Sequence, residues 1–215
     1  TNGGAIASSG DGLVTVTGTS FTKNDALDEG GAAMNGNKGS FAIADATFVE
    51  NTALNGGGFG NEGSGLVTVA DSTFTKNSAF DAAVLTGGEG GGMHSSSSGE
   101  VIVTDTVFAD NRARDGGGLA NEGGGSASIT SSRFTANKAE EAGGGILIQA
   151  GAVPMVDLDV IGNISDALEE GGGGISYAGD KAALLFEHDA EMVAGVHVAG
   201  PRHTAALRED DHPLP

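Results

Sequence analysis

Acidic side chains recur just before clusters of glycine, and carboxylate oxygens are therefore the chemistry that the sequence offers most densely. They are Asp28, Glu29, Asp115, Glu140, Glu141, Glu169 and Glu170, with Asn55 and Glu89 at the same place before two further clusters. Oxygen-only ligands of this kind suit calcium, so a calcium site is one interpretation. The alternative, which we favour, is a solvated acidic edge whose like charges are screened by salt. The Gly-rich turns lack the Asp of the calcium-binding nonapeptide repeat, and the period also differs.

Other motifs with catalytic or metal-binding chemistry are weak. The Gly58–Gly63 stretch matches a dinucleotide-binding pattern, but a strand-like GLVTV follows where a helix should begin. Gly174-Ile-Ser176-Tyr-Ala178 approaches a nucleophile elbow but ends in Ala. A last group near the C-terminus has metal-ligand residue types without a fixed ligand spacing: His188, His197, His203, Glu187, Asp189 and Glu191. We predict no catalytic residue, no cofactor other than calcium, and no firm metal site.

Charge and composition restrict the classes of partner. A net charge of −19, from 29 acidic and 10 basic residues, argues against binding nucleic acid or an anionic membrane. No apolar run of about 18 residues is present, so no membrane insertion by this segment is expected. A groove that cleaves acidic glycans needs aromatic platforms and cations, but the chain has no Trp and one Tyr. We therefore predict that the chain is not an enzyme, and keep a polysaccharide-binding or lyase-like β-helix as the alternative.

The elements that would position these side chains are repeats. A Phe followed three residues later by Asn occurs at Phe21 and Asn24, Phe48 and Asn51, Phe74 and Asn77, Phe108 and Asn111, and Phe134 and Asn137, with Val160 and Asn163 as a decayed copy. The steps between copies are 27, 26, 34, 26 and 26 residues, and a fixed period of this length indicates a stacked solenoid. The long step indicates an insertion of about eight residues within 80–88.

Within each repeat, apolar residues alternate with small or polar ones, as in a strand with one buried face. A turn residue follows, then the Phe, then a Gly cluster that ends in an apolar residue. Strand, corner, strand and Gly-rich corner in about 26 residues fit one rung of a parallel β-helix. The sequence thus predicts an all-β, single-stranded parallel β-helix of about seven rungs.

If the turns stack in register, the residues at the same position of successive repeats form a column, and each column has its own role. The phenylalanines Phe21, Phe48, Phe74, Phe108 and Phe134 should form a buried stack. The asparagines Asn24, Asn51, Asn77, Asn111, Asn137 and Asn163 should form a ladder in which each amide donates to the next. Lys23, Glu50, Lys76 and Asp110 should form an outward column of alternating charge that helps to fix the register.

The pairing of a literal Gly-Gly-Ala-Ile (residues 3–6) and its Gly-rich variants with Phe-x-x-Asn, once each per repeat, resembles the passenger domains of polymorphic outer-membrane proteins. These are autotransporter-type surface adhesins. The resemblance covers about residues 1–178. It implies a right-handed β-helix at a cell surface or outside the cell, with adhesion or surface-layer building as its work. The expected partners are a host-surface receptor or glycan, or a second copy stacked end to end in a filament.

The repeat fails after Ala178, so we predict two parts: residues 1–178 form the β-helix, and residues 179–215 form a C-terminal capping segment and polar tail. Residues 180–200 fit either one or two last strands or a short amphipathic helix. No signal peptide is evident and the chain opens inside a repeat, so we expect it to be part of a longer protein. Asn163-Ile-Ser165 matches a glycosylation sequon, but the Asn belongs to the inward ladder.

Overall fold

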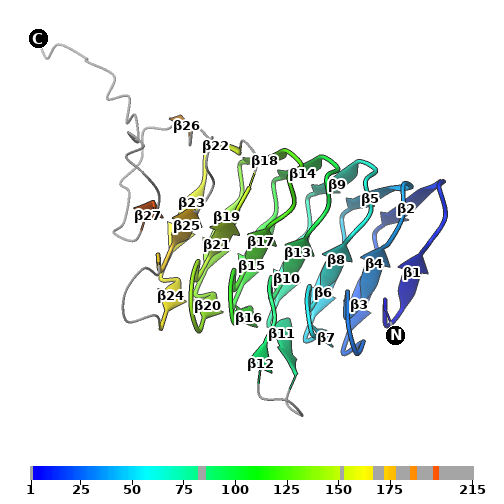
Figure 1. Cartoon of the computed structure of the whole chain (residues 1–215), viewed down its shortest axis with the longest axis horizontal. Coiled ribbons are helices and arrows are strands. Elements are labelled where there is room, and N and C mark those ends of the chain that lie inside the picture. The colour runs from blue at the N-terminus through cyan, green and yellow to red at the C-terminus, as the bar shows by residue number, and fades with distance from the viewer. Residues whose placement is uncertain are drawn as a thin grey trace, which may run out of the picture.

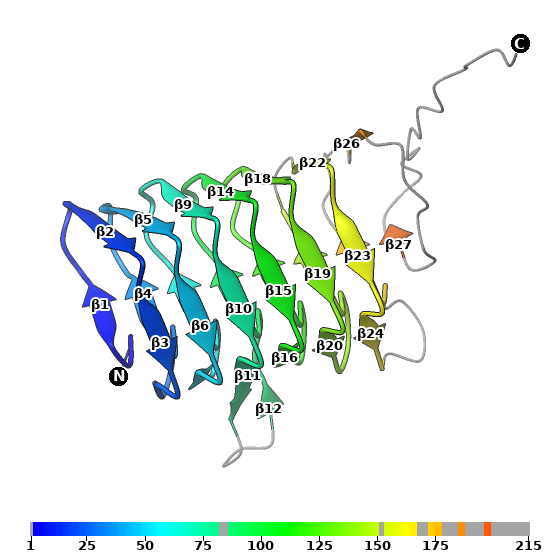
Figure 2. The ribbon, with the colours of Figure 1, turned by 180° about the vertical axis from the view of Figure 1, so that it is seen from behind.

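The chain coils into a parallel β-solenoid of about six turns, as the computed structural model shows (Figure 1). The structure describes residues 2–81, 86–150, 153–166, 172–177, 185–187 and 196–198. Their regular elements are all strands, and successive turns lie side by side along one axis when seen from either side (Figure 2). The prediction of an all-β, right-handed parallel β-helix is therefore confirmed. No helix in the described part is long and apolar enough to cross a membrane.

Each complete turn contributes one strand to each of four sheets. The first sheet, which begins each turn after a Gly cluster, contains β1 (Ile6–Ser8), β4 (Ala33–Asn35), β8 (Phe59–Asn61), β13 (Met93–Ser95), β17 (Leu119–Asn121), β21 (Ile146–Ile148), β25 (Ile175–Tyr177) and β27 (Val196–Val198). The second contains β2 (Leu13–Thr17), β5 (Ser40–Ala44), β9 (Val67–Ala70), β14 (Val101–Thr104), β18 (Ala127–Thr130), β22 (Pro154–Val156) and β26 (Leu185–Glu187).

The remaining two sheets carry the Phe-x-x-Asn motif. The third contains β3 (Ser20–Thr22), β6 (Thr47–Val49), β10 (Thr73–Thr75), β15 (Val107–Ala109), β19 (Arg133–Thr135) and β23 (Asp159–Ile161). The fourth contains the short strands β7 (Thr52–Ala53), β11 (Ser78–Asp81), β16 (Arg112–Ala113), β20 (Lys138–Ala139) and β24 (Ile164–Ser165), with β12 (Thr86–Gly87) paired to β11. We number these sheets one to four below.

The phenylalanines lie in the third sheet, each paired in register with the Phe of the next turn. Their rings are stacked with centroids 4.8, 4.4, 4.9 and 4.7 Å apart from Phe21 to Phe134. From Phe48 onward the rings are fully buried, so each contributes about 1.5–3 kcal/mol through burial of apolar surface.

The Gly clusters are next to this stack, which explains why the two motifs occur together. A Cβ atom at Gly92 would lie 2.8 Å from the ring of Phe108, and one at Gly118 would lie 2.9 Å from the ring of Phe134. Both distances are too short for a real side chain, and the ring of Phe108 cannot move because it is packed between those of Phe74 and Phe134. The corner before each first-sheet strand therefore needs glycine so that the chain can pass over the Phe.

The asparagines form a continuous ladder at the corner that follows the Phe. Asn111 illustrates the pattern: its Nδ2 donates to the carbonyl of Phe74 (2.9 Å) and to Oδ1 of Asn137 (2.9 Å). Its Oδ1 accepts hydrogen bonds from both the backbone N–H and Nδ2 of Asn77 (2.9 and 3.0 Å). The side chain thus satisfies polar groups of three turns inside the protein.

The corners themselves are left-handed. Asp45, Asp71, Asp105, Ser131 and Asp157 lie between the second and third sheets with φ of 47–55°. Asp and Ser tolerate such corners, as expected from their positions in the repeat. The next corner is less conventional, because Lys23, Glu50, Lys76, Asp110 and Ala136 have φ of 53–56° there, and Gly162 has φ 64°.

The insertion is a hairpin that leaves the stack intact. β11 and β12 pair antiparallel, and the Cα partner of Phe74 is still Phe108. The hairpin projects from the fourth sheet (Figure 1). Phe80 on this hairpin lies below the guanidinium of Arg112, at 5.5 Å from the ring centroid.

The C-terminal part continues the coil where it is described. β26 extends the second sheet and β27 extends the first, so residues 185–187 and 196–198 are strands. The predicted polar tail lies outside the described residues, as do the segments 178–184, 188–195 and 199–215. Four of the six C-terminal residues considered as metal ligands lie in these segments: His188, His203, Asp189 and Glu191. Asn163 belongs to the ladder, because its Oδ1 accepts from Asn137 and its Nδ2 donates to Phe134.

A prediction on stability concerns the middle of the Asn ladder. Replacing the buried Asn111 with Ala should lower the free energy of unfolding by about 2–4 kcal/mol, because buried groups of neighbouring turns lose their partners. Asn24→Ala, at the start of the ladder, should cost only about 1 kcal/mol. Chemical denaturation followed by circular dichroism measures both, and equal losses would contradict the proposed importance of the inner ladder.

A second prediction isolates the backbone at the left-handed corner. Gly162 and Ala136 occupy the same exposed column, and a Cβ at Gly162 would meet nothing within 4 Å. Gly162→Ala should therefore cost about 1 kcal/mol through backbone strain alone, and Ala136→Gly should recover up to about 1 kcal/mol. Thermal unfolding of the two variants tests this, and opposite signs of the shift in Tm are the expected result.

Candidate functional site

The outer face of the first sheet carries a buried, charged cluster at its centre. The middle residues of its strands from β1 to β25 are Ala7, Met34, Gly60, His94, Ala120, Leu147 and Ser176. His94 is the only charged or titratable residue among them, and only 2% of its surface is exposed. Gly60 and Ala120 occupy the neighbouring strands beside it, so the imidazole has small residues on both sides.

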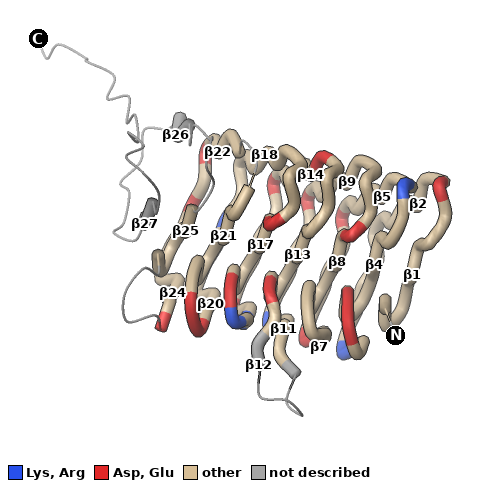
Figure 3. Tube along the Cα trace, viewed as in Figure 1, with Lys and Arg blue, Asp and Glu red and all other residues tan. Residues whose placement is uncertain are grey.

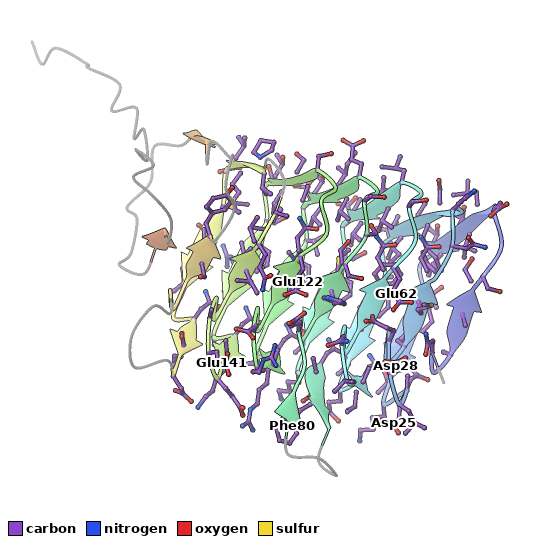
Figure 4. The ribbon with its side chains drawn as sticks, viewed as in Figure 1. Asp25, Asp28, Glu62, Phe80, Glu122 and Glu141 are labelled. Atoms are coloured by element: carbon purple, nitrogen blue, oxygen red, sulfur yellow. The ribbon has the colours of Figure 1, made fainter. Side chains whose placement is uncertain are left out.

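Carboxylates reach this face from both ends of the strands. Glu62 and Glu122 follow the C-terminal ends of first-sheet strands, and Asp28 and Glu141 precede the N-terminal ends of others (Figure 4). Acidic residues greatly outnumber basic ones along the whole solenoid (Figure 3). His94 therefore lies in a strip of negative charge that runs across several turns.

The corner before each first-sheet strand holds a polar column of its own. Asn55 donates from Nδ2 to Oε1 of Glu29 (3.1 Å) and accepts at Oδ1 from the backbone N–H of Glu89 (3.0 Å). Arg114 donates from Nη2 to Oε1 of Glu89 (2.9 Å) and from Nε to Oδ2 of Asp115 (2.8 Å). This column is thus bonded from turn to turn, and Glu29 and Asp115 are buried.

His94 contacts three carboxylates that come from three turns. Its Nδ1 lies 3.2 Å from Oε1 of Glu29, while its Nε2 lies 3.4 Å from Oε2 of Glu89 and 3.7 Å from Oε2 of Glu122. The Nε2 atom is buried and makes no hydrogen bond. The side chains of Glu89 and Glu122 are 15% and 20% exposed, so the Nε2 side of the ring is the side nearer to solvent.

Gly60 is required for the approach of Glu29. A Cβ atom at Gly60 would lie 2.5 Å from Oε2 of Glu29, so the carboxylate rests directly on the backbone of β8. Glu29 precedes β4 and crosses this position to reach His94 on β13. Any larger residue at position 60 would displace Glu29 from the imidazole.

The cluster shifts the pKa values of its members in opposite directions. Burial alone would lower the pKa of His94, but contacts with Glu122, Glu29 and Glu89 raise it well above 6.5. Burial acts to raise the pKa of Glu89, but His94, Glu122 and Arg114 lower it to about 2. The pKa of Glu122 is raised by burial and by Glu89. The pKa of Glu62 is raised by burial and by the nearby charges of Glu29 and Asp28.

The predicted calcium residues that the structure describes are not gathered at one place. Glu29 and Asp115 lie in the buried column described above, whereas Asp28 and Glu141 are exposed. Glu140 accepts a hydrogen bond from Arg112 (2.7 Å). Glu169 and Glu170 lie outside the described residues. The favoured interpretation of a solvated edge is wrong for Glu29 and Asp115, because both are buried and bonded within the column.

The predicted charge column forms only its first pair. Lys23 Nζ lies 3.4 Å from Oε2 of Glu50, with both side chains well exposed. Within the described part of the chain, no ion pair joins Lys76 to Glu50 or to Asp110. An exposed pair of this kind contributes about 0.2–1 kcal/mol, so the Phe and Asn stacks carry the register instead.

The sequence analysis missed His94, Glu62 and Glu122. Two signals could have found them: His94 is the only His within residues 1–178, and Asn-Glu-Gly follows the first-sheet strand at 61–63 and again at 121–123. A second buried ladder was also missed, in which Asn35 donates to Asn61 (3.0 Å) and Asn61 donates to Ser95 (3.1 Å). This ladder joins the ends of β4, β8 and β13, next to the cluster.

No protein-family model matches this chain, and no curated protein or solved structure matches it either. The resemblance of its two motifs to polymorphic outer-membrane proteins therefore stays a prediction.

A prediction on pH follows from the charges that face His94, which are Glu29, Glu89 and Glu122. A raised folded-state pKa means that the stabilisation is complete below about 6.5, the unfolded value, and is lost as the pH rises through the folded value. In EDTA, Tm should therefore fall as the pH rises above about 6.5 and through the raised folded-state pKa in the wild type, and change less in His94→Gln. Lys76→Gln, which removes an exposed positive charge, is the control and should keep the wild-type slope.

Proposed function

We propose that this chain is a structural and adhesive module of a longer protein at a cell surface or outside the cell. The observation that carries the proposal is the use of the repeated positions: Phe, Asn and Gly recur where one turn binds the next. About six turns at about 4.8 Å per turn give a stiff spacer about 30 Å long. A stiff spacer with long faces is suited to hold binding surfaces away from a membrane.

The charge and the motifs also support this proposal. The Gly-Gly-Ala-Ile and Phe-x-x-Asn pair resembles surface adhesins, and the net charge of −19 keeps such a rod soluble in a salty medium. The partner would be a receptor or glycan of another cell, or another copy stacked end to end. Calcium bound by the acidic residues would add stiffness in the same setting.

One observation favours the alternative, a β-helix that binds or cleaves polysaccharide. Glu89 and Glu122 face each other beside His94, and their pKa values are moved apart, to about 2 for Glu89 and upward for Glu122. Two carboxyl groups with separated pKa values are the usual arrangement for acid–base cleavage of a glycosidic bond. This alternative would place catalysis on the outer face of the first sheet.

The experiment that tests the proposal is light scattering with negative-stain electron microscopy, with and without calcium, followed by binding to a glycan array. If the chain is a surface module, we expect monodisperse short rods that bind glycans or cells. Ordered filaments would instead support end-to-end assembly of copies of the chain. Cleavage of acidic or neutral polysaccharides that disappears in Glu122→Gln would contradict the proposal and support the alternative. Rods that bind no glycan, no cell and no second copy would also contradict it.

A further inference from the structure

The Nε2 atom of His94 is one of four buried side-chain polar atoms in the described part of the protein that make no hydrogen bond. It is buried, has no hydrogen-bond partner, and points between the carboxylates of Glu89 and Glu122. One potential ligand atom from each of these three residues lies within 4.8 Å of the others. A buried nitrogen that faces two carboxylates without bonding to either is a feature that a cation would explain.

The distances suit a metal ion better than hydrogen bonds. Nε2 lies 3.4 Å from Glu89 and 3.7 Å from Glu122, which is too long for good N–H···O bonds. Two ligands bound at about 2.0 Å to a tetrahedral ion are about 3.3 Å apart. The Nε2 atom of His94 therefore already lies at nearly the distance from each carboxylate that two ligands of such an ion have from each other.

The opposite ring nitrogen is held as metal-binding histidines usually are. Nδ1 lies 3.2 Å from Oε1 of Glu29, and a carboxylate on the distal nitrogen fixes the ring and its tautomer. Asn55 donates to the same carboxylate, and Gly60 leaves the space that the carboxylate occupies. Arg114 holds the other oxygen of Glu89, Oε1, so that Oε2 faces His94.

We propose that Glu89, His94 and Glu122 bind a divalent transition-metal ion of the zinc class, with Glu29 as the positioning residue for His94. An imidazole nitrogen with two carboxylates favours zinc and its neighbours over calcium or magnesium, which prefer oxygen ligands. Binding replaces the Nε2 proton of His94, which is released to solvent, while Nδ1 keeps its proton and donates it to the carboxylate of Glu29. Solvent completes the coordination on the exposed side of Glu89 and Glu122. This site is independent of the proposed surface role.

The test is isothermal titration of the full chain, stripped with EDTA and dialysed, with Zn²⁺, and with Co²⁺ as a spectroscopic probe. The expected result is one zinc per chain and a Co²⁺ absorption spectrum of low-symmetry, four-coordinate type. Glu122→Gln and His94→Gln should each weaken binding at least about tenfold, and Glu29→Gln should weaken it by about 10–100-fold. Glu140→Gln, which removes a carboxylate paired with Arg112 outside the site, should bind like the wild type.

Two results would overturn the proposal. The first is zinc binding that is equal in the wild type and in Glu122→Gln, a residue at the edge of the cluster whose replacement leaves the core unchanged. The second is calcium binding that displaces zinc and persists in His94→Gln, because the ligands would then be oxygen atoms of the acidic residues. Circular dichroism of each variant shows whether it is folded, and Gly60→Ala adds a variant that disturbs Glu29 without changing any ligand.

Discussion

Every side chain in this solenoid must be compatible with the side chain at the same place in the next turn, about 4.8 Å away. Phe meets this requirement by stacking its ring, and Asn meets it because its amide both donates and accepts. A carboxylate does not, since two like charges at this spacing repel each other. The corner column avoids the conflict by placing Asn55 between Glu29 and Glu89 and Arg114 between Glu89 and Asp115. The requirement for register thus allows Phe and Asn to recur in every turn, whereas a column of carboxylates needs uncharged or basic residues between its members.

The same requirement explains how much of the fold the sequence could predict. Phe-x-x-Asn and the Gly clusters recur because each copy contacts the next, so their period predicted the coil, the Phe stack, the Asn ladder and the site of the inserted hairpin. The count of about seven rungs becomes about six turns. The charge column was predicted less well, because Lys76 and Asp110 occupy a left-handed corner whose exposed side chains are free to point apart.

The candidate site could not be predicted in this way, because its residues do not repeat. His94 has Gly60 and Ala120 as its neighbours in the column, and a search for periodic residues passes over such a position. The contact between Glu29 and His94 joins residues 65 apart in sequence, and it depends on the absence of a side chain at Gly60. Only the register of β4, β8 and β13 brings them together. The sequence pattern predicted the column of acidic residues before the Gly clusters. It could not predict that Glu29 and Asp115 are buried or that Glu29 and Glu89 contact His94, because these features depend on how the turns pack.

The inserted hairpin and the charged cluster around His94 lie in neighbouring turns. The inserted hairpin at β11 and β12 ends just before Glu89, and the strand that follows contains His94. The next turn contributes Arg114, whose backbone N–H donates to the carbonyl of Gly88 and whose side chain holds Glu89. A solenoid made only of identical turns offers the same surface at every level and cannot assemble unlike groups at one point. The change in chemistry therefore directly follows the change in length along the chain, and a hairpin that leaves the Phe stack in register allows both changes without loss of the core.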